Sequence, residues 1–177
     1  MQQRLFDPVH AAVLGQAARR FKPASVLDIG CGSGRLLRKV HAYWPEAQLS
    51  GVDPAQGMLE VARQLTPEAR FFMGSGEALP LADASVDLAL STISFHHWQD
   101  QAAGVHEVAR VLRPGGSFLL ADFTVPTWLA GLLPRSRFHS AAQMRALFEQ
   151  AGLVVEAQPA TVARLVRITI GTKPAEA

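Results

Sequence analysis

The residues best suited to chemistry in this sequence surround a short glycine-rich stretch. Residues 26–29 form an apolar run interrupted only by Asp28, and residues 30–34 alternate glycine with other small side chains. The apolar run suits a buried parallel strand. Glycine lets the backbone bend sharply and lets a ligand approach without a Cβ in the way. From Arg35 the pattern becomes helical, so the stretch predicts a strand, a ligand-binding loop and a helix.

The spacing of these glycines separates one class of ligand from another. A dinucleotide loop reads G-x-G-x-x-G, but after Gly30 and Gly32 the place of its third glycine holds Arg35, and the third glycine here is Gly34. A phosphate-binding P-loop would need Gly-Lys-Ser/Thr, which does not follow. The spacing therefore disfavours a nucleotide phosphate. Taken alone, the stretch also fits a glycine turn without a ligand.

A second acid follows the next predicted strand. Asp53 lies about twenty residues beyond the glycine loop, where a Rossmann-type fold places the acid that binds a ribose. A carboxylate can accept hydrogen bonds from both ribose hydroxyls. The alternative is an N-cap, because Pro54 and a helical pattern follow directly.

A pair of histidines follows a later strand. His96 and His97 come after a predicted strand at residues 84–91, and residues that leave the carboxyl end of a central strand face the ligand crevice of an open α/β sheet. Imidazole titrates near neutral pH, so either histidine can act as a general base. A purely structural role is the alternative.

Strands and helices must alternate along the chain to position these groups. Asp7 as N-cap and Pro8 at the first helical position predict a helix over about 8–21. The later pattern predicts helices at 34–43, 55–65, 101–112 and from Ser140 to about 151, and strands at 47–53, 70–73, 84–91, 117–122, 153–156 and 165–171.

Length and composition limit the classes of protein. The 177 residues are 49% hydrophobic and 18% charged, which indicates one globular domain with a full core. The formal net charge is +2 and the basic residues are scattered along the sequence. This positive charge is too small and too dispersed to indicate a dedicated nucleic-acid binder. The single Cys31 excludes an internal disulfide and a cysteine-based zinc site, and we interpret it as a small residue that fits the loop. Without an apolar leader or membrane-length run, we expect a cytoplasmic protein with no membrane span.

Several short motifs together resemble those of a known family. Asp-x-Gly-x-Gly-x-Gly at residues 28–34 resembles motif I of class I S-adenosylmethionine (SAM)-dependent methyltransferases of type 11. Residues 74–80 resemble that family's Gly-Asp-Ala-Glu-x-Leu-Pro loop, residues 84–91 its fourth strand, and residues 110–116 its R-x-L-x-P-G-G turn. The motifs stand in the family's order and cover about 24–123.

The resemblance implies a fold and a domain organisation. It implies an α/β, single-domain, Rossmann-like methyltransferase fold. Its central sheet would be mostly parallel and seven-stranded with an antiparallel last strand, and helices would cover both faces. One SAM-dependent domain would span 1–177, with the N-terminal helix, the motif core at about 24–123 and a short substrate-covering region at about 123–139.

The resemblance also implies a binding site. Asp28 would lie near the amino group of SAM, Asp53 on the ribose and Met58 against the adenine, although a core methionine is an equal alternative. Ser75 stands where the family usually has Asp, which would weaken the adenine contact. The implied cofactor-binding set is Asp28, Gly30, Cys31, Gly32, Gly34, Asp53, Pro54, Met58, Ser75, Gly76, Glu77, Ala78, Ser91 and His96. His96 and His97 would lie nearest the transferred methyl group as candidate catalytic residues.

The resemblance implies methyl transfer from SAM to a small-molecule acceptor by in-line displacement, with S-adenosylhomocysteine as product and no metal. A catalytically silent SAM-binding or partner-binding module is the alternative, and an NAD-binding oxidoreductase is weaker because of Arg35. Residues 123–139 carry Trp128 and other apolar side chains, which predicts a cover over an apolar or aromatic acceptor. Packing on the sheet edge or on the partner of a homodimer is the alternative. In that region Arg135 or Arg137 would be available to an acidic group.

Overall fold

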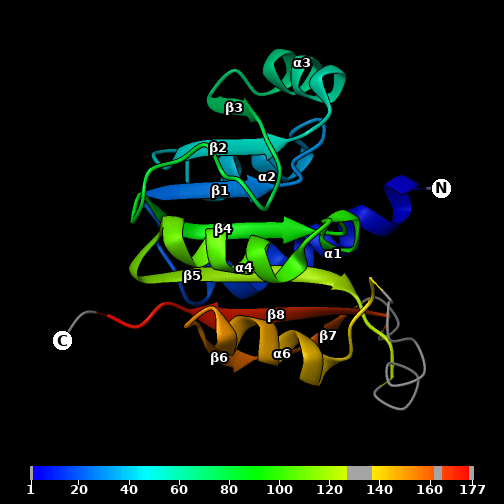
Figure 1. The fold of residues 1–177 in the computed structure, drawn as a ribbon. Coiled ribbons are helices and arrows are strands. Elements are labelled where there is room, and N and C mark those ends of the chain that lie inside the picture. The colour runs from blue at the N-terminus through cyan, green and yellow to red at the C-terminus, as the bar shows by residue number, and fades with distance from the viewer. Residues whose placement is uncertain (1, 127–136, 162–164, 176–177) are drawn as a thin grey trace.

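The computed structural model describes residues 2–126, 137–161 and 165–175. Its first half contains α1 (Gln2–Ala18), β1 (Ser25–Ile29), α2 (Arg35–Tyr43), β2 (Gln48–Asp53), α3 (Gln56–Leu65), β3 (Ala69–Met73) and β4 (Val86–Thr92). Its second half contains the 3₁₀ turn η1 (Phe95–His97), α4 (Gln101–Val111), β5 (Leu112–Phe123), α6 (Ala141–Gln150), β6 (Val154–Ala157), β7 (Ala160–Thr161) and β8 (Val166–Thr172). The alternation of strands and helices confirms the α/β prediction (Figure 1).

The described strands form one open sheet in the order β3-β2-β1-β4-β5-β8-β6, with β7 paired to β8. Neighbours from β3 to β5 are parallel, whereas β8 runs antiparallel to β5 and β6. The mostly parallel sheet with an antiparallel last strand is therefore confirmed, and the two-residue β7 adds a strand that the sequence did not predict. The chain moves outward from β1 to β3 and then restarts on the other side of β1 with β4. Ligands bind at such a reversal in open α/β sheets.

Helices cover both faces of the sheet and bury two separate apolar cores. One core joins α1, α2 and α3 to the sheet through buried residues such as Val13, Leu37 and Leu59. The other joins α4 and α6 to the opposite face through Val108 and Phe148. Figure 1 shows α4 and α6 in front of the sheet and α1 and α2 behind it. Burial of apolar surface on both faces explains why the central strands are almost continuously apolar.

Two element boundaries differ from the sequence predictions. The first helix begins at Gln2, so Asp7 and Pro8 lie inside it and not at its start. The Asp7 carboxylate accepts hydrogen bonds from Arg35 and Lys39 of α2, so a residue typical of an N-cap makes a contact between helices instead. Pro8 lacks an N–H and removes one helical hydrogen bond, which the docking of α1 on the core must offset.

The second difference is the start of β5, at the Pro-Gly-Gly motif. This motif was expected to be a turn before a strand at 117–122, but β5 already begins at Leu112, and its pairing with β4 shifts register between Val86 and Leu88. Arg113 to Gly116 is therefore a bulge within the strand, which Gly115 permits with a left-handed φ of 78°. The expected cap of α6 is confirmed, since Ser140 and Gln143 form a capping box.

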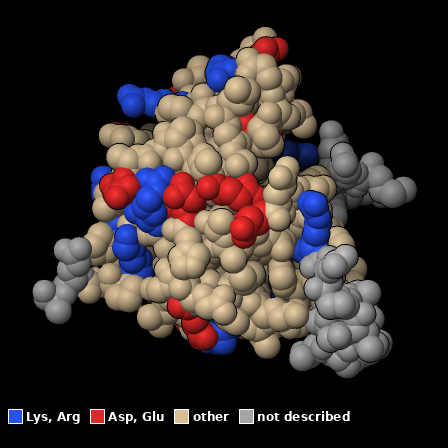
Figure 2. Space-filling view, viewed as in Figure 1, with Lys and Arg blue, Asp and Glu red and all other residues tan. Residues whose placement is uncertain are grey.

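The predicted substrate cover at 123–139 falls largely on residues 127–136, which lie outside the described residues. Among the helices that the structure describes, none is long and apolar enough to cross a membrane. Acidic side chains gather across the middle of the face in Figure 2. Among the described residues, Asp83 and Glu107 both pair with Arg110.

Candidate functional site

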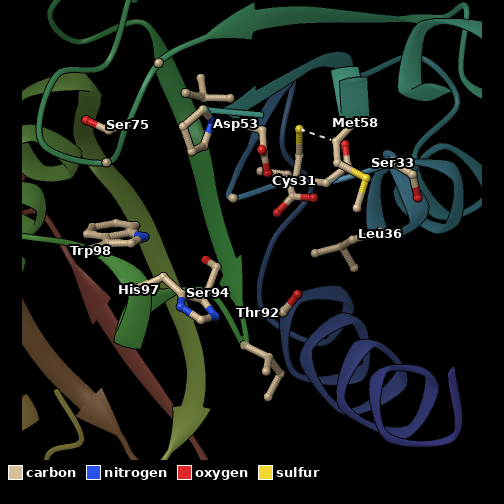
Figure 3. Close-up of a pocket in the computed structure, with 18 of the residues that line it drawn as sticks. Cys31, Ser33, Leu36, Asp53, Met58, Ser75, Thr92, Ser94, His97 and Trp98 are labelled. Carbon is tan, nitrogen blue, oxygen red and sulfur yellow. Dashed lines mark hydrogen bonds between the residues drawn. The ribbon is translucent and has the colours of Figure 1, made fainter. Parts of the chain in front are cut away.

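The candidate site is a cavity of about 890 Å³ at the carboxyl ends of β1, β2 and β4. This volume is near the upper end of the range for small-molecule sites, about 300–1,000 Å³. The cavity brings together most of the residues predicted from the sequence: Asp28, Gly30, Cys31, Gly32, Asp53, Pro54, Met58, Ser75, Gly76, Glu77 and His97. Figure 3 shows several of them around the cavity, between α1 and the β3–β4 loop.

The glycine loop has the shape that its sequence predicts. Gly30, Gly32 and Gly34 all have left-handed φ angles, of 73°, 50° and 72°, which other residues rarely adopt. A Cβ on Gly30 would lie 2.4 Å from the Ser94 hydroxyl oxygen, so that position must also stay bare for packing. A Cβ on Gly32 would meet nothing within 4 Å, and this glycine lines the cavity. Gly34 instead packs against Phe71 and is not part of the cavity lining.

Asp53 connects the glycine loop to the start of α3. One carboxylate oxygen accepts from the Gly32 N–H at 2.8 Å and the other from the Ala55 N–H at 2.9 Å. Asp53 is therefore not the N-cap of α3, because that position is Ala55 and no side chain caps this helix. A ligand-binding role is compatible with the two backbone contacts, because a carboxylate has about four lone-pair sites. Met58 lies one turn into α3 and is 48% exposed, so this apolar side chain is available to cover a flat ligand group.

Asp28 is a buried acid with an unmet hydrogen-bonding need. It is 2% exposed, and its Oδ1 atom has no hydrogen-bond partner among the described residues. Burial, together with the nearby Asp53 carboxylate, raises the pKa of Asp28 to about 8. A cationic amino group would pair with this carboxylate and favour its charged form. Asp28 thus fits the amino group of a bound SAM molecule.

The surroundings of Cys31 do not favour a thiolate nucleophile. Its burial and the nearby Asp28 and Asp53 raise the pKa of the thiol far above neutral pH, and the thiol contacts the Gly32 carbonyl oxygen at 3.7 Å. The side chain is therefore a protonated thiol that packs between the glycine loop and β2. This agrees with its interpretation as a small residue that fits.

The β3–β4 loop contributes Gly74, Ser75, Gly76 and Glu77 to the cavity, whereas Ala78 lies outside its lining. Burial alone would raise the pKa of Glu77, but hydrogen bonds from the Ser75 hydroxyl and from backbone N–H groups lower it overall. The Glu77 carboxylate accepts from the Gln99 N–H at 2.6 Å. It therefore ties this loop to the segment after η1.

Gly76 stands where the family's Gly-Asp-Ala-Glu-x-Leu-Pro loop has Ala, and this difference has a steric explanation. A Cβ on Gly76 would lie 2.7 Å from the Trp98 indole, and a Cβ on Gly104 of α4 would lie 2.3 Å from the same ring. The Trp98 ring therefore lies between two glycines, is buried, and lines the cavity. A bare residue at position 76 leaves room for this ring.

The two histidines differ in their surroundings. His97 lines the cavity, whereas His96 does not. His96 Nδ1 lies 2.8 Å from an oxygen of the buried Asp122, whose other oxygen accepts from the His96 N–H at 3.1 Å. The His96 ring also stacks on Phe138 at 5.3 Å. The Asp122 carboxylate thus orients His96.

Ser91 also lies outside the cavity lining. Its hydroxyl pairs with that of Ser94 at 2.8 Å, and Ser94 donates to the Ile29 carbonyl at 3.0 Å. This network joins β4 to the end of β1. Ile93 of the same segment has a left-handed φ of 52°, which is strained for a β-branched residue and typical of functional sites.

The structure adds lining residues that sequence reasoning missed. They are Phe6 and His10 of α1, then Ser33, Arg35, Leu36, Val52, Gly74, Thr92, Ile93, Ser94, Trp98, Gln99 and Asp100. Trp98 and the segment at 92–94 stand beside the predicted histidines, and that proximity could have indicated them. Phe6 and His10 gave no signal, because only the docking of α1 brings them to the cavity.

Comparison with known proteins bears on this site. Residues 27–120 match the family model described as a methyltransferase domain. A malonyl-[acyl-carrier protein] O-methyltransferase of Methylococcus capsulatus is 39% identical over 104 residues, which is 57% of this chain and 38% of that protein. The chain spans about 40% of the length of the first curated relatives that it matches.

Two solved structures share the fold over nearly the whole chain. YcgJ of Bacillus subtilis has a TM-score of 0.77 and 24% identity, covering 95% of this chain and 100% of that one. A chain from the complex of a Haloferax volcanii methyltransferase with the Trm112 methyltransferase activator has a TM-score of 0.82 and 24% identity, covering 99% and 93%. With motifs, fold and family model in agreement, the chain belongs to the type 11 family of class I SAM-dependent methyltransferases.

Proposed function

We propose that this chain transfers a methyl group from SAM to a small-molecule acceptor. The observation that carries the proposal is that Asp28, Gly32 and Asp53 line one and the same cavity at the switch point of the sheet. Its volume of about 890 Å³ leaves space beside a cofactor for a second small molecule. SAM, when bound, supplies a methyl group on a cationic sulfur, and the departing thioether needs no acid.

The residues of the chain would divide the binding work. The Asp28 carboxylate pairs with a cationic amino group, and the lone pairs that Asp53 keeps beyond its two backbone contacts accept from ribose hydroxyls. Met58 and Pro54 cover the adenine, with Ser75 and Gly76 at its edge. Alignment of donor and acceptor in a cavity that excludes water is the main catalytic effect expected of such a site.

His97 and His96 are the proposed proton acceptors. His97 lines the cavity and can take a proton directly, whereas His96 is held by Asp122 and lies outside the lining. We expect His96→Ala and His97→Ala to leave S-adenosylhomocysteine affinity within a few fold while lowering turnover. Asp122→Asn should imitate His96→Ala if His96 is the base. Unchanged turnover in both histidine variants would remove them from the mechanism.

Calorimetric titration with S-adenosylhomocysteine and with NAD tests the first step of this proposal. We expect binding of S-adenosylhomocysteine and none of NAD, and the reverse result would favour an oxidoreductase. Transfer from radiolabelled SAM to a panel of small alcohols, amines, thiols and acids then tests the second step. Cofactor binding without any transfer would favour a silent module.

A second acceptor class follows from the named relatives. The Methylococcus relative is a malonyl-[acyl-carrier protein] O-methyltransferase, so an acyl group attached to a carrier protein is the alternative acceptor. The same radiolabel assay with malonyl-loaded acyl-carrier protein separates the two. Label in the protein fraction, with none in the small molecules, would overturn the small-molecule proposal.

A further inference from the structure

Trp98 presents a firmly held ring to the cavity, and the division of binding work above does not use it. The residue is 7% exposed and lines the cavity. Its ring packs between Gly76 and Gly104, since a Cβ on either glycine would lie 2.7 Å or less from a ring atom. Phe95 adds an edge-to-face contact with 5.0 Å between the ring centroids. These contacts leave the indole little freedom to turn.

The indole N–H of Trp98 is a donor without a hydrogen-bond partner among the described residues. A buried tryptophan N–H usually finds such a partner. Three side-chain atoms in the described part of the chain are both buried and unpartnered, namely His10 Nδ1, Asp28 Oδ1 and Arg167 Nε. The Trp98 nitrogen is not one of them, so it keeps accessible surface. Figure 3 shows it on the side of the ring that is turned toward the other lining residues.

This donor lies beside the β3–β4 loop. One of the ring atoms that a Cβ on Gly76 would approach to 2.7 Å is Cε2, the carbon bonded to the indole nitrogen. Gly76 and Ser75 both line the cavity, and they stand at the proposed edge of the adenine. In Figure 3, Ser75 and Trp98 lie on the same side of the cavity, across from Met58. The indole N–H is therefore at the adenine end of the site.

Ser75 and Trp98 have opposite hydrogen-bonding characters. The Ser75 hydroxyl donates its proton to the Glu77 carboxylate, so only its oxygen lone pairs remain for a ligand. Those lone pairs suit the amino group of adenine, but they cannot serve the ring nitrogens, which are acceptors themselves. An indole N–H is a donor only. The two side chains together offer the acceptor and the donor that one adenine requires.

We propose that the indole N–H of Trp98 donates a hydrogen bond to a ring nitrogen of the adenine in SAM. Trp98 is then a residue that selects adenine, and it offsets part of the contact that is weaker with Ser75 than with an aspartate. Gly76 and Gly104 serve this contact by leaving room for the ring. The inference rests on the proposed position of the cofactor and adds to it the group that recognises the adenine ring.

Three analogues of S-adenosylhomocysteine test this hydrogen bond. In the 1-deaza, 3-deaza and 7-deaza compounds one adenine ring nitrogen is replaced by CH, which removes one acceptor and keeps the shape. Each is titrated by calorimetry into the wild type and into variants without the indole N–H. For one of the three analogues, we expect the loss of affinity to be about three- to tenfold larger in the wild type than in the variants, as one neutral hydrogen bond allows.

Two replacements remove the donor in different ways. Trp98→Phe keeps an aromatic ring, whereas benzothienylalanine at position 98 puts sulfur in place of the N–H and keeps the full ring size. The second therefore preserves the packing if the smaller ring disturbs the fold. Trp44→Phe is the matched control, because Trp44 packs on the opposite core and does not line the cavity. This control should discriminate among the analogues as the wild type does.

NMR of the indole ¹H–¹⁵N signals gives a direct second readout. The chain has three tryptophans, and the signal of Trp98 is identified by its absence in Trp98→Phe. We expect its indole proton to move downfield when S-adenosylhomocysteine binds, because a hydrogen bond deshields the proton. The shift should be smaller with the one analogue that lacks the paired nitrogen.

One result would overturn the proposal. If each of the three analogues loses the same affinity in the wild type as in both variants, the Trp98 N–H does not contact a ring nitrogen of the adenine. That result leaves the binding of S-adenosylhomocysteine itself intact. Failure of the wild type to bind S-adenosylhomocysteine would instead refute the proposed function.

Discussion

At the scale of single residues, Asp53 combines a structural and a proposed ligand-binding role. Its carboxylate holds the Gly32 and Ala55 N–H groups, and its remaining lone pairs are proposed to bind the ribose. Asp53→Ala should remove charge-assisted hydrogen bonds of about 1.5–3 kcal/mol, which weakens S-adenosylhomocysteine about ten- to hundredfold. Asp53→Asn, which keeps one acceptor oxygen, should give an intermediate constant by calorimetry. An unchanged constant in Asp53→Ala would refute the ribose assignment.

Asp28 should make the stability of the cofactor-free protein depend on pH. Its pKa of about 8 in the folded state lies well above the value of about 3.9 in an unfolded chain. The folded protein therefore holds an extra proton, and this contribution to stability is lost as the pH rises toward 8. His10, with its pKa lowered to about 4, gives the opposite slope below about pH 6.5.

The clearest range for this measurement is therefore pH 6.5 to 8. Over that range the Tm of the cofactor-free wild type should fall more steeply than the Tm of Asp28→Asn, measured by differential scanning calorimetry. Equal slopes for the two proteins would show that the Asp28 carboxyl does not titrate in this range.

At the scale of elements, α1 depends on its apolar face more than on its ion pairs. Leu14 is 1% exposed in the core that joins α1 to the sheet, so Leu14→Ala should lower the free energy of unfolding by about 2–5 kcal/mol. The carboxylate of Asp7 is partly exposed, and surface ion pairs contribute little, so Asp7→Asn should have a much smaller effect. Urea unfolding of both variants tests this order, and a reversed order would contradict it.

The Trp98 ring connects three segments of the structure: the β3–β4 loop, the turn after β4, and α4. Gly104→Ala would place a Cβ about where the ring now lies, and overpacking of this kind costs about 1–3 kcal/mol. Replacing Trp98 by the smaller Phe should recover part of the loss in the double variant. Thermal unfolding of the two single variants and the double variant measures the coupling, and simple additivity would contradict the contact.

At the scale of the whole molecule, a ligand bound at the switch point should stabilise the entire fold. S-adenosylhomocysteine at a hundred times its dissociation constant should add about 2.7 kcal/mol to the free energy of unfolding. For a chain of 177 residues this raises the Tm by about 5–10 °C. NAD at the same concentration is the control and should leave the Tm unchanged. A shift with NAD alone would contradict the cofactor assignment.

The sequence by itself determined the fold class and the half of the cavity that we propose binds the cofactor. Alternating apolar strands and amphipathic helices predicted the α/β sheet, and parallel strands necessarily end at the same edge. That geometry is why Asp28, Gly32 and Asp53, each at or just after the end of a predicted strand, could be expected to meet. The sequence around the strand ends was sufficient for this prediction, because the glycines and acids lie next to the strands whose ends they follow.

The tertiary structure alone decided the other half of the site. Asp7 and Pro8 form a local pattern for a helix start, but both lie inside α1, where Asp7 pairs with Arg35 of α2. No local pattern relates His10 to Thr92, which is 82 residues away. His96 and His97 are adjacent in sequence, yet only His97 lines the cavity, because the η1 turn directs His96 to Asp122. These placements depend on long-range packing, which periodicity and spacing in a single sequence do not encode.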